Sequence, residues 1–431
     1  MPVLKDSMLY GTTLFGGTHN KGTIYRINTD ASEYRTIYNF SNSNDGSVPI
    51  GSMLVDDTLL YGMASSQGSG FESTIFCIDP DGNNYSVLKQ LADSEGYTPY
   101  GSLIQWEDTL FGMAAYGGDM STFTNGCGTI FRIQKDGSNF EVINTFTGSE
   151  SDGREPHGSL YLSGGILYGM TLWGGSEGLG TIFRINTDGS DFNLIHNFTG
   201  NTDDGSYPHA SLCGSGNTLY GTTREGGAHY DGTIFSMEKD GNNFRVLHSF
   251  SGGQQGRFPF CTLTQNNHML YGTTFYGGEY DKGTIFQIDT SGGNFTILHS
   301  FEDSNGQNPV SSLLLNDSKL YGVAPPGASI AGGILFAFDL TVPDIVPGIS
   351  EEDDLSIYPN PVSGICHIDL NGPATSQLFI RIYNMKGKLV FEKSHPKTTS
   401  CSIDISGLSS GIYILKVTSE QLTYLGRILK E

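Results

Sequence analysis

Two loop positions of this sequence carry side chains that could bind a ligand, and both recur about every fifty residues. One position follows the proline of an [Asp/Glu/Asn/Gln]-Gly-x-x-Pro motif, and the other lies beside a Gly-Gly pair. Aromatic rings stack on sugar faces, while nearby carboxylates and amides bind hydroxyl groups. The candidates for such a glycan-binding or protein-binding site are Tyr116, His157, Trp173, His209, Arg224, Phe260 and Tyr276.

The same residue types have other uses. The rings can pack between repeats, and Trp173, which precedes Gly174-Gly175, is either an exposed binding anchor or a filler of such a gap. Histidines and arginines near one channel, here His157, His209, Arg154 and Arg224, would also suit an enzyme. Their spacing forms no recognisable catalytic constellation, and HExxH and phosphate-loop motifs do not occur. We therefore expect no catalysis and no cofactor.

Charge and hydropathy exclude further classes. The net charge is −22, and because residues 351–431 carry only −1, residues 1–350 carry −21. Such a surface repels phosphate backbones, so we expect no nucleic-acid partner. No run reaches the roughly 18–20 apolar residues of a membrane span. The Asp-rich turn at Asp79–Asn83 has Gln90 where an EF-hand needs glutamate, so it predicts a hairpin turn and no metal site.

The repeat itself predicts the fold. A [Tyr/Phe]-Gly pair recurs seven times at spacings of 50 to 57 residues, and a Gly-Thr-Ile-Phe-like block follows each pair. Each unit contains short runs rich in β-branched and aromatic residues, with Asp-Gly turns such as Asp136-Gly137 before the last run. Four strands in about 50 residues, repeated seven times, predict an all-β fold in which residues 1–340 form a seven-bladed β-propeller.

This pattern, LYGTT-x-x-GG followed by GTIF-x-I and DG-x-x-F, resembles the tandem GloVer repeats of secreted bacterial proteins. Its period and its Gly-Gly pair also resemble kelch blades. The resemblance covers about residues 1–340. It implies a propeller and brings no established activity.

The two ends of the repeat array are irregular. Strands two and three occur seven times but strand four only six times, since the seventh unit ends at Leu340. Residues 1–4 have the pattern of a degraded first strand, and the start of the chain lacks the features of a signal peptide. We expect the missing outer strand and a signal peptide to lie upstream of Met1.

The C-terminal part differs from the repeats. Residues 341–354, with two prolines and an acidic run, read as a linker, and alternating runs in residues 355–431 predict a small Ig-like β-sandwich. This segment resembles the type A C-terminal sorting domain of the type IX secretion system. The matching residues are Tyr358, Pro359, Asn360, Pro361, Gly387, Leu408, Gly411, Tyr413 and Lys416. The resemblance implies export across the outer membrane of a Bacteroidota-type bacterium, with the type IX machinery as partner.

Together these observations predict a secreted, surface-displayed binding or scaffold propeller whose ligand is an extracellular glycan or protein. A secreted enzyme acting on polysaccharide, as a lyase or hydrolase, is the alternative, and a purely structural surface protein is the third. The six cysteines form no CxxC pair. A disulfide between Cys366 and Cys401, both on predicted strands, is left open.

Overall fold

The chain divides into two compact units, Met1–Phe338 and Asp339–Glu431. The expected linker at 341–354 lies outside the described residues. In the described ranges, no helix is long and apolar enough to cross a membrane. The computed structural model describes residues 1–41, 44–65, 73–326, 332–340, 355–359, 361–370, 377–384, 389–396, 398–418 and 423–430.

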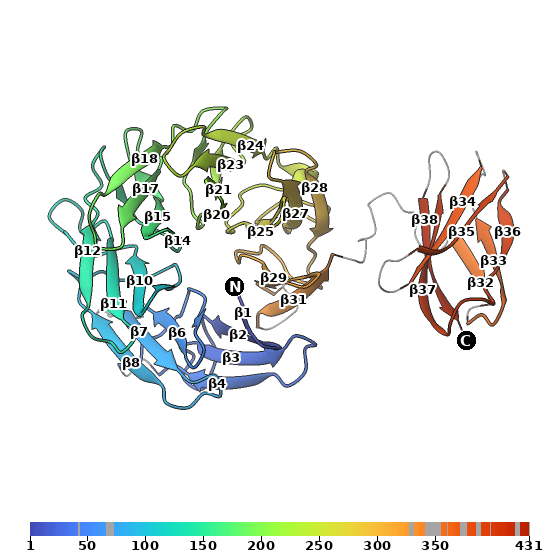
Figure 1. The fold of residues 1–431 in the computed structure, drawn as a ribbon, viewed down its shortest axis with the longest axis horizontal. Helices are drawn as coiled ribbons and strands as arrows, with labels where there is room; N and C mark the ends of the chain where they lie inside the picture. The colour runs from blue at the N-terminus through green and yellow to red at the C-terminus, as the bar shows by residue number, and fades with distance from the viewer. Residues whose placement is uncertain are drawn as a thin grey trace. The chain divides into compact units, whose positions relative to one another are not determined.

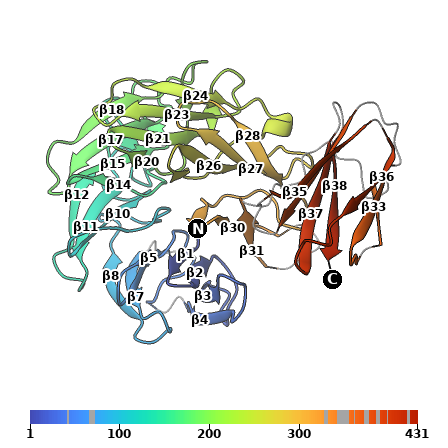
Figure 2. The same ribbon diagram turned by 45° about the vertical axis from the view of Figure 1, so that its right-hand side comes forward.

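The first unit is a succession of small antiparallel sheets, each built from consecutive strands. Figure 1 shows these sheets following one another around a common centre, and the turned view in Figure 2 shows the same order. The first sheet contains β1 (Val3–Lys5), β2 (Met8–Thr13), β3 (Thr23–Asn28) and β4 (Arg35–Asn39). The second contains β5 (Leu54–Val55), β6 (Leu60–Ala64), β7 (Ser73–Ile78) and β8 (Ser86–Leu91). The third contains β9 (Ile104–Trp106), β10 (Thr109–Ala114), β11 (Thr129–Gln134) and β12 (Glu141–Thr145).

The following sheets repeat this order. Among the described residues of the first unit, six of the main sheets have four strands and the last main sheet has three. The later sheets are β14 (Tyr161–Ser163), β15 (Ile166–Thr171), β17 (Thr181–Asn186) and β18 (Asn193–Asn197); β20 (Cys213–Ser215), β21 (Thr218–Thr223), β23 (Thr233–Glu238) and β24 (Arg245–Ser249); β25 (Thr264–Asn266), β26 (Met269–Thr274), β27 (Thr284–Asp289) and β28 (Thr296–Ser300); and β29 (Leu314–Asn316), β30 (Lys319–Ala324) and β31 (Ile334–Asp339).

Short elements complete the loops of this unit. Two further pairs of strands lie in the loops, and one turn is a 3₁₀ helix. They are β13 (Gly153–Arg154) with β16 (Trp173–Gly174), β19 (Gly205–Ser206) with β22 (Glu225–Gly226), and η1 (Gly253–Gln255).

The register of the strands explains the [Tyr/Phe]-Gly pairs. The glycine of each second strand faces the buried aromatic residue of the third, as Gly62 faces Phe76 and Gly112 faces Phe131. A Cβ atom added to Gly62 would lie 2.5 Å from Cζ of Phe76. Any larger residue would collide with the ring, so each sheet needs glycine at this position.

The buried rings also join one sheet to the next. Phe198, at the end of β18, meets Phe235 of β23 with ring centroids 5.6 Å apart, and both side chains are fully buried. The first and last sheets pack together as well, because Leu9 and Ile27 share a cluster with Tyr321. β1 pairs with β2 as the inner strand of its own sheet, where Val3 faces Tyr10. Apolar contacts therefore connect the sheets from first to last.

The second unit has two antiparallel sheets. Side chains of both sheets, including Ile368 and Ile403 of one and Ile380 and Leu415 of the other, share a single core. Cys366 and Cys401 are buried free thiols on paired strands, offset by two positions, so the disulfide left open above is not formed here. The sheets are β32 (Leu355–Tyr358), β33 (Ile365–Leu370) and β36 (Ser400–Asp404), and β35 (Leu389–His395), β34 (Leu378–Asn384), β37 (Gly411–Thr418) and β38 (Thr423–Lys430).

Candidate functional site

The inner strands of the first unit and the loops before them surround a cavity of about 1410 Å³. Six loops each contribute the residue that follows the loop proline, namely Ile50, Tyr100, His157, His209, Phe260 and Val310. Three of the candidate residues, His157, His209 and Phe260, therefore lie at one cavity, and Arg224 and Tyr276 line it too.

Each of these loops is fixed to the preceding sheet. Glu155, just before the loop proline Pro156, has a φ of 56°, a conformation uncommon for residues other than glycine. Its N–H donates to the carbonyl of Cys127 at 2.8 Å. Pro156 Cδ would lie 2.7 Å from a Cβ at Gly128, which accounts for the glycine of the Gly-Thr-Ile-Phe block. The loop is thereby held in a geometry that places His157 on the cavity.

A series of hydroxyl hydrogen bonds connects the inner ends of the sheets. The backbone N–H of Ser52 donates to Oγ of Ser102 at 2.9 Å, and the N–H of Ser102 donates to Oγ of Ser159 at 2.8 Å. The same bond continues from sheet to sheet through Ser211, Thr262 and Ser312. These bonds set the spacing of the loop residues two positions earlier.

The cavity-facing rings form a continuous row, here called the ring belt, made of Tyr100, His157, His209 and Phe260. Successive ring centroids are 4.3 Å, 4.4 Å and 5.0 Å apart. Phe275 extends the row, with its centroid 5.3 Å from that of Phe260. Such a row offers aromatic surface to a ligand without buried charge.

The two histidines of the ring belt are hydrogen-bonded to each other. Nδ1 of His157 lies 3.0 Å from Nε2 of His209, so one ring donates and the other accepts. Burial, and then the neighbouring His209, lower the pKa of His157 to about 3. Burial, and then the Arg224 charge, lower the pKa of His209 to about 4. Both rings are thus neutral at neutral pH, and Nε2 of His157 is buried without a hydrogen-bond partner.

Arg224 brings a positive charge to this cavity. Its Nε lies 3.2 Å from Oε1 of Glu225, and its side chain is 43% exposed. Its Cζ lies 5.7 Å from the ring centre of Phe260 and 5.8 Å from that of Phe258. The guanidinium group is therefore oriented by a carboxylate and two rings while part of it faces solvent.

Trp173 and Tyr116, two further candidates from the sequence, are not among the residues that line the cavity. Thr171 Oγ1 donates to the carbonyl of Trp173 at 2.9 Å, and Trp173 pairs with Arg154. Its ring lies 4.7 Å from Tyr207, and the Arg154 guanidinium lies over it at 5.4 Å. In other repeats the residue one position earlier does line the cavity, as Arg224 and Phe275 do, but Leu172 is not among the lining residues.

Tyr116 is engaged in a similar way. Its hydroxyl donates to Oε2 of Glu155 at 3.4 Å, and its ring lies 5.7 Å from that of Tyr97. Burial, followed by the charge of Glu155, raises the pKa of Tyr116. Tyr116 and Trp173 therefore pack against loop residues, and Tyr276 is the residue of this repeat position that lines the cavity.

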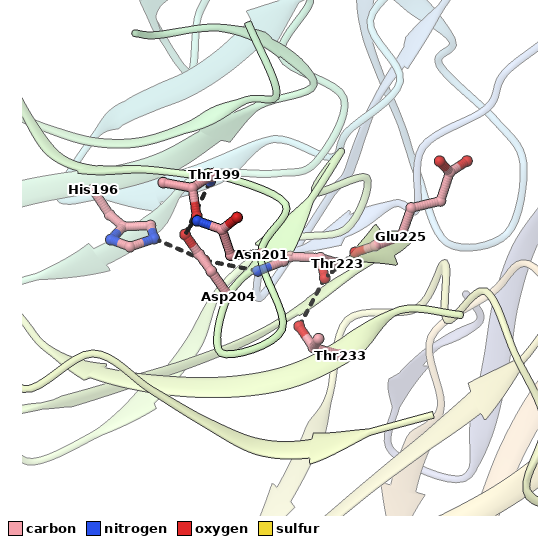
Figure 3. A network of polar contacts seen from close by, with 8 residues as sticks. His196, Thr199, Asn201, Asp204, Thr223, Glu225 and Thr233 are labelled. Carbon is pink, nitrogen blue, oxygen red and sulfur yellow. Dashed lines mark hydrogen bonds and ion pairs between the residues drawn. The ribbon is translucent and has the colours of Figure 1, made fainter. Parts of the chain in front are cut away.

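The acidic residue of the loop motif has a local structural task. Figure 3 shows Asp204 between His196 and Thr199. The backbone N–H of Thr199 donates to Oδ2 of Asp204 at 2.9 Å, and Nε2 of His196 lies 3.1 Å from Oδ1. Asp152 likewise accepts from the N–H of Thr147 at 2.8 Å. These carboxylates close their own loops and are not available for a ligand.

The outer strands also join neighbouring sheets through stacked rings, which the sequence did not indicate. His196 stacks on Phe244 of the next sheet, with ring centroids 3.9 Å apart and planes at 8°. Tyr38 stacks on Tyr85 in the same way, at 3.9 Å, and donates to Asp45 at 3.0 Å.

The pKa of the loop carboxyl group depends on the outer-strand residue that faces it. Burial pushes the pKa of Asp204 up, but the hydrogen bond from His196 and the backbone donors outweigh it, so the pKa lies below its usual value. At the equivalent position of the earlier sheet, Asn144 replaces the histidine. There burial dominates and raises the pKa of Asp152.

The sorting-motif residues lie in the second unit. The hydroxyl of Tyr358 donates to Asp369 at 2.7 Å, and that of Tyr413 donates to the carbonyl of Ser409 at 2.8 Å. Leu408 packs on the core of the unit. Gly411 faces Lys430, and Lys416 faces Arg381. Pro359 and Pro361 flank Asn360, which with Gly387 lies outside the described residues.

Comparisons with known proteins give two family matches. The Gloeobacter/Verrucomicrobia repeat matches residues 2–123 and 115–336, and the secretion system C-terminal sorting domain matches residues 356–431. No curated protein matches the sequence.

Several solved structures are similar to this chain at low sequence identity. A protein assigned as a 6-phosphogluconolactonase of Bacteroides uniformis is 13% identical, with 92% of this chain and 98% of that chain covered and a TM-score of 0.50. The periplasmic gluconolactonase of Pseudomonas aeruginosa is 14% identical, with 92% and 98% covered and a TM-score of 0.47. TolB of Acinetobacter baumannii is 12% identical, with 66% of this chain and 62% of that chain covered and a TM-score of 0.40. The first likeness supports a propeller-like all-β fold.

Proposed function

Since this chain belongs to the Gloeobacter/Verrucomicrobia repeat family and ends in a secretion-system sorting domain, we propose that it is an exported seven-bladed propeller that binds an extracellular glycan or protein at its central cavity. The sorting domain implies engagement with the type IX secretion system and a secreted or cell-surface location. It assigns no role to the first unit, so that role must be argued from the cavity.

The seven blades are supported by the order of the sheets and by their packing. In the described residues, each sheet follows the previous one along the chain, and the last contains the seventh [Tyr/Phe]-Gly pair, Tyr321-Gly322. Tyr321 also donates from its hydroxyl to the carbonyl of Thr29 at 3.4 Å. Packing of the last sheet on the first is what a ring of blades requires.

The ring belt is the observation that carries the binding proposal. It places two aromatic rings and two neutral imidazoles side by side on a cavity of about 1410 Å³, with an arginine next to them. A cavity lined mainly by apolar and aromatic groups with a few oriented polar ones is typical of a small-ligand site.

An enzyme acting on polysaccharide has weaker support. His157, His209 and Arg224 do converge on the cavity, as a lyase would need. A hydrolase of the common type needs two carboxyl groups, and the described lining residues include none. One ring nitrogen of each histidine is hydrogen-bonded to the other histidine. The sequence has two G-x-S-x-G matches, at 174–178 and 407–411, and both Ser176 and Ser409 lie between strands rather than at a strand-to-helix turn. We therefore favour binding over catalysis.

A first experiment exposes the full chain to a glycan array and to a pull-down of extracellular proteins. We then expect Tyr100→Ala to weaken the ligand found by about 1–3 kcal/mol, because the change removes a ring that faces the cavity. Tyr230→Ala, whose ring is 68% exposed and outside the cavity lining, is the control and should change nothing. Equal affinities of the two variants, or no ligand in either screen, would contradict the proposal.

Export is tested separately. Behind a signal peptide, in a bacterium with type IX secretion, the full chain should become accessible to external protease because residues 356–431 match the sorting domain. The chain ending at residue 354 should stay in the periplasm. A periplasmic marker that remains protected is the control for lysis. Surface exposure of the shortened chain would show that the C-terminal unit does not direct export.

A further inference from the structure

The charge of the cavity is opposite to that of the protein. The chain carries a net charge of −22. Among the described residues that line the cavity, Arg224 is the single charged side chain, and none is acidic. The loop acids nearby, such as Asp152 and Asp204, are buried and bound to their own backbone. Met1 also lines the cavity, and burial lowers the pKa of its α-amino group to about 6, so that this group is mostly neutral at neutral pH. The charged side chain that the described lining contains is therefore a cation, which is ion-paired through its Nε with Glu225.

Arg224 is held in a way that leaves its outer nitrogens free for a ligand. Glu225 approaches Nε at 3.2 Å, and the rings of Phe258 and Phe260 lie beside the guanidinium plane. The described part of the chain gives no hydrogen-bond partner to its two terminal nitrogens. A guanidinium group offers parallel N–H donors that match the two oxygens of a carboxylate.

The ring belt begins next to this charge. Phe260 lies 5.7 Å from Cζ of Arg224, and the His209 ring lies 5.0 Å from the Phe260 ring. The two ring planes are 88° apart, so a sugar ring can stack on one of them with its edge against the other, and its substituents would then lie near the guanidinium group. Both histidines are neutral, so they add no second positive charge.

We propose that the cavity binds a sugar bearing a single carboxylate, a hexuronic acid residue of a short oligosaccharide, with its carboxylate on Arg224 and its ring in the corner between Phe260 and His209. This inference rests on the proposed binding function and names its ligand class. Arg224 faces Glu225 through Nε, and its two terminal nitrogens can bind one ligand carboxylate. A long polyanion would carry further charges over a surface of the same sign, which repels it.

The test uses uronic-acid-containing oligosaccharides and the same oligosaccharides after reduction of the carboxyl group to an alcohol. Titration of the full chain should show binding to acidic members of these pairs. Carboxyl reduction and Arg224→Gln should each weaken the Kd tenfold or more, and the two changes together should cause no further loss, since both remove one contact. Arg224→Lys keeps the charge but not the paired donors and should recover part of the affinity.

The matched control is Arg257→Gln. Arg257 also lies over Phe258, at 5.5 Å, and beside an acid, Asp281, at 3.9 Å, but it does not line the cavity. Its replacement should leave the Kd within twofold of the wild-type value. Unfolding curves of both variants establish that the fold is intact.

Three results would overturn the inference: equal binding of the carboxyl-reduced sugars, unchanged binding by Arg224→Gln, or preference for a sulfated sugar over the uronic acids. If another glycan or a protein binds and Tyr100→Ala abolishes that binding, the cavity remains the binding site and only the ligand class is wrong. If the screens find no ligand of any kind, the proposed function fails with it.

Discussion

Replacing Phe235 with alanine should lower the free energy of unfolding of the first unit by roughly 3–5 kcal/mol, the usual loss for a buried aromatic side chain. Phe235 is fully buried. Its ring lies 5.6 Å from that of Phe198 in the preceding sheet and 5.3 Å from that of Phe244 in its own sheet. The cavity left behind would separate two neighbouring sheets, so the effect would reach beyond one sheet.

Tryptophan fluorescence can follow this unit alone, because both tryptophans, Trp106 and Trp173, belong to it. Urea unfolding of the full chain monitored in this way gives the change in free energy. Phe15→Ala is the control, since that ring is 53% exposed and should matter by less than about 0.5 kcal/mol. A loss below about 1 kcal/mol for Phe235→Ala would mean that the sheets are not held together by these rings.

The strands of the first unit were predictable from the sequence because their signals are local. Asp-Gly pairs fix the turns, and β-branched residues fill the runs between them. The reason for the [Tyr/Phe]-Gly pairs was not predictable, since it depends on which residue of the neighbouring strand lies opposite. Gly62 is needed because Phe76 faces it, and only the register of β6 and β7 reveals that.

The loop motifs indicate some of the residues that line the cavity but not all of them. The post-proline residues His157 and His209 do line it, and their binding of a ligand stays a prediction. At the Gly-Gly loops the sequence offers two adjacent residues, and nothing local decides which one faces inward. Thr171 binds the carbonyl of Trp173 and turns the indole toward Tyr207 instead. A contact ten residues away along the chain, between Thr171 and Thr181, helps to fix that geometry.

The partners of the polar loop residues were also not predictable from the sequence. The acids of the Gly-x-x-Pro motif looked like ligand-binding groups because sequence shows their type and not their partners. Asp204 is instead bound to Thr199 and His196. His196 in turn stacks on Phe244 of the next sheet. Only the assembled sheets show that this carboxylate stabilises the scaffold and that Arg224 is the charged side chain that lines the cavity.

Acidification should destabilise the first unit well before its carboxylates are protonated. Burial lowers the pKa of His157 to about 3 and those of His209 and His248 to about 4, whereas histidine in an unfolded chain titrates near 6.5. Between pH 6.5 and pH 4 the unfolded chain therefore binds more protons than the folded one. The contribution of these histidines to the free energy of unfolding is fully present above pH 6.5 and falls as the pH is lowered toward 4.

The expected loss between pH 7 and pH 4.5 is on the order of 3 kcal/mol, since each fully shifted histidine contributes up to about 1.4 kcal/mol per pH unit and the three are coupled or partly exposed. Asp152 acts in the opposite direction, because burial raises its pKa and its protonation favours the folded state. One carboxyl group does not reverse the sign set by three imidazoles.

Urea unfolding at several pH values, followed by tryptophan fluorescence, measures how the free energy of unfolding changes with pH. The natural variation between the repeats suggests which substitutions to use. Asn144 occupies in the third sheet the position that His248 occupies in the fifth, so His248→Asn keeps a side chain that the repeat already accepts. It should flatten the pH dependence, because the group that the unfolded chain protonates has gone. His268→Asn replaces an exposed histidine and should leave the slope as it is. Stability that stays constant from pH 7 to pH 4.5 would mean that the buried imidazoles are protonated in the folded protein as readily as in the unfolded chain. Equal pH dependence of the two variants would mean the same of His248 alone.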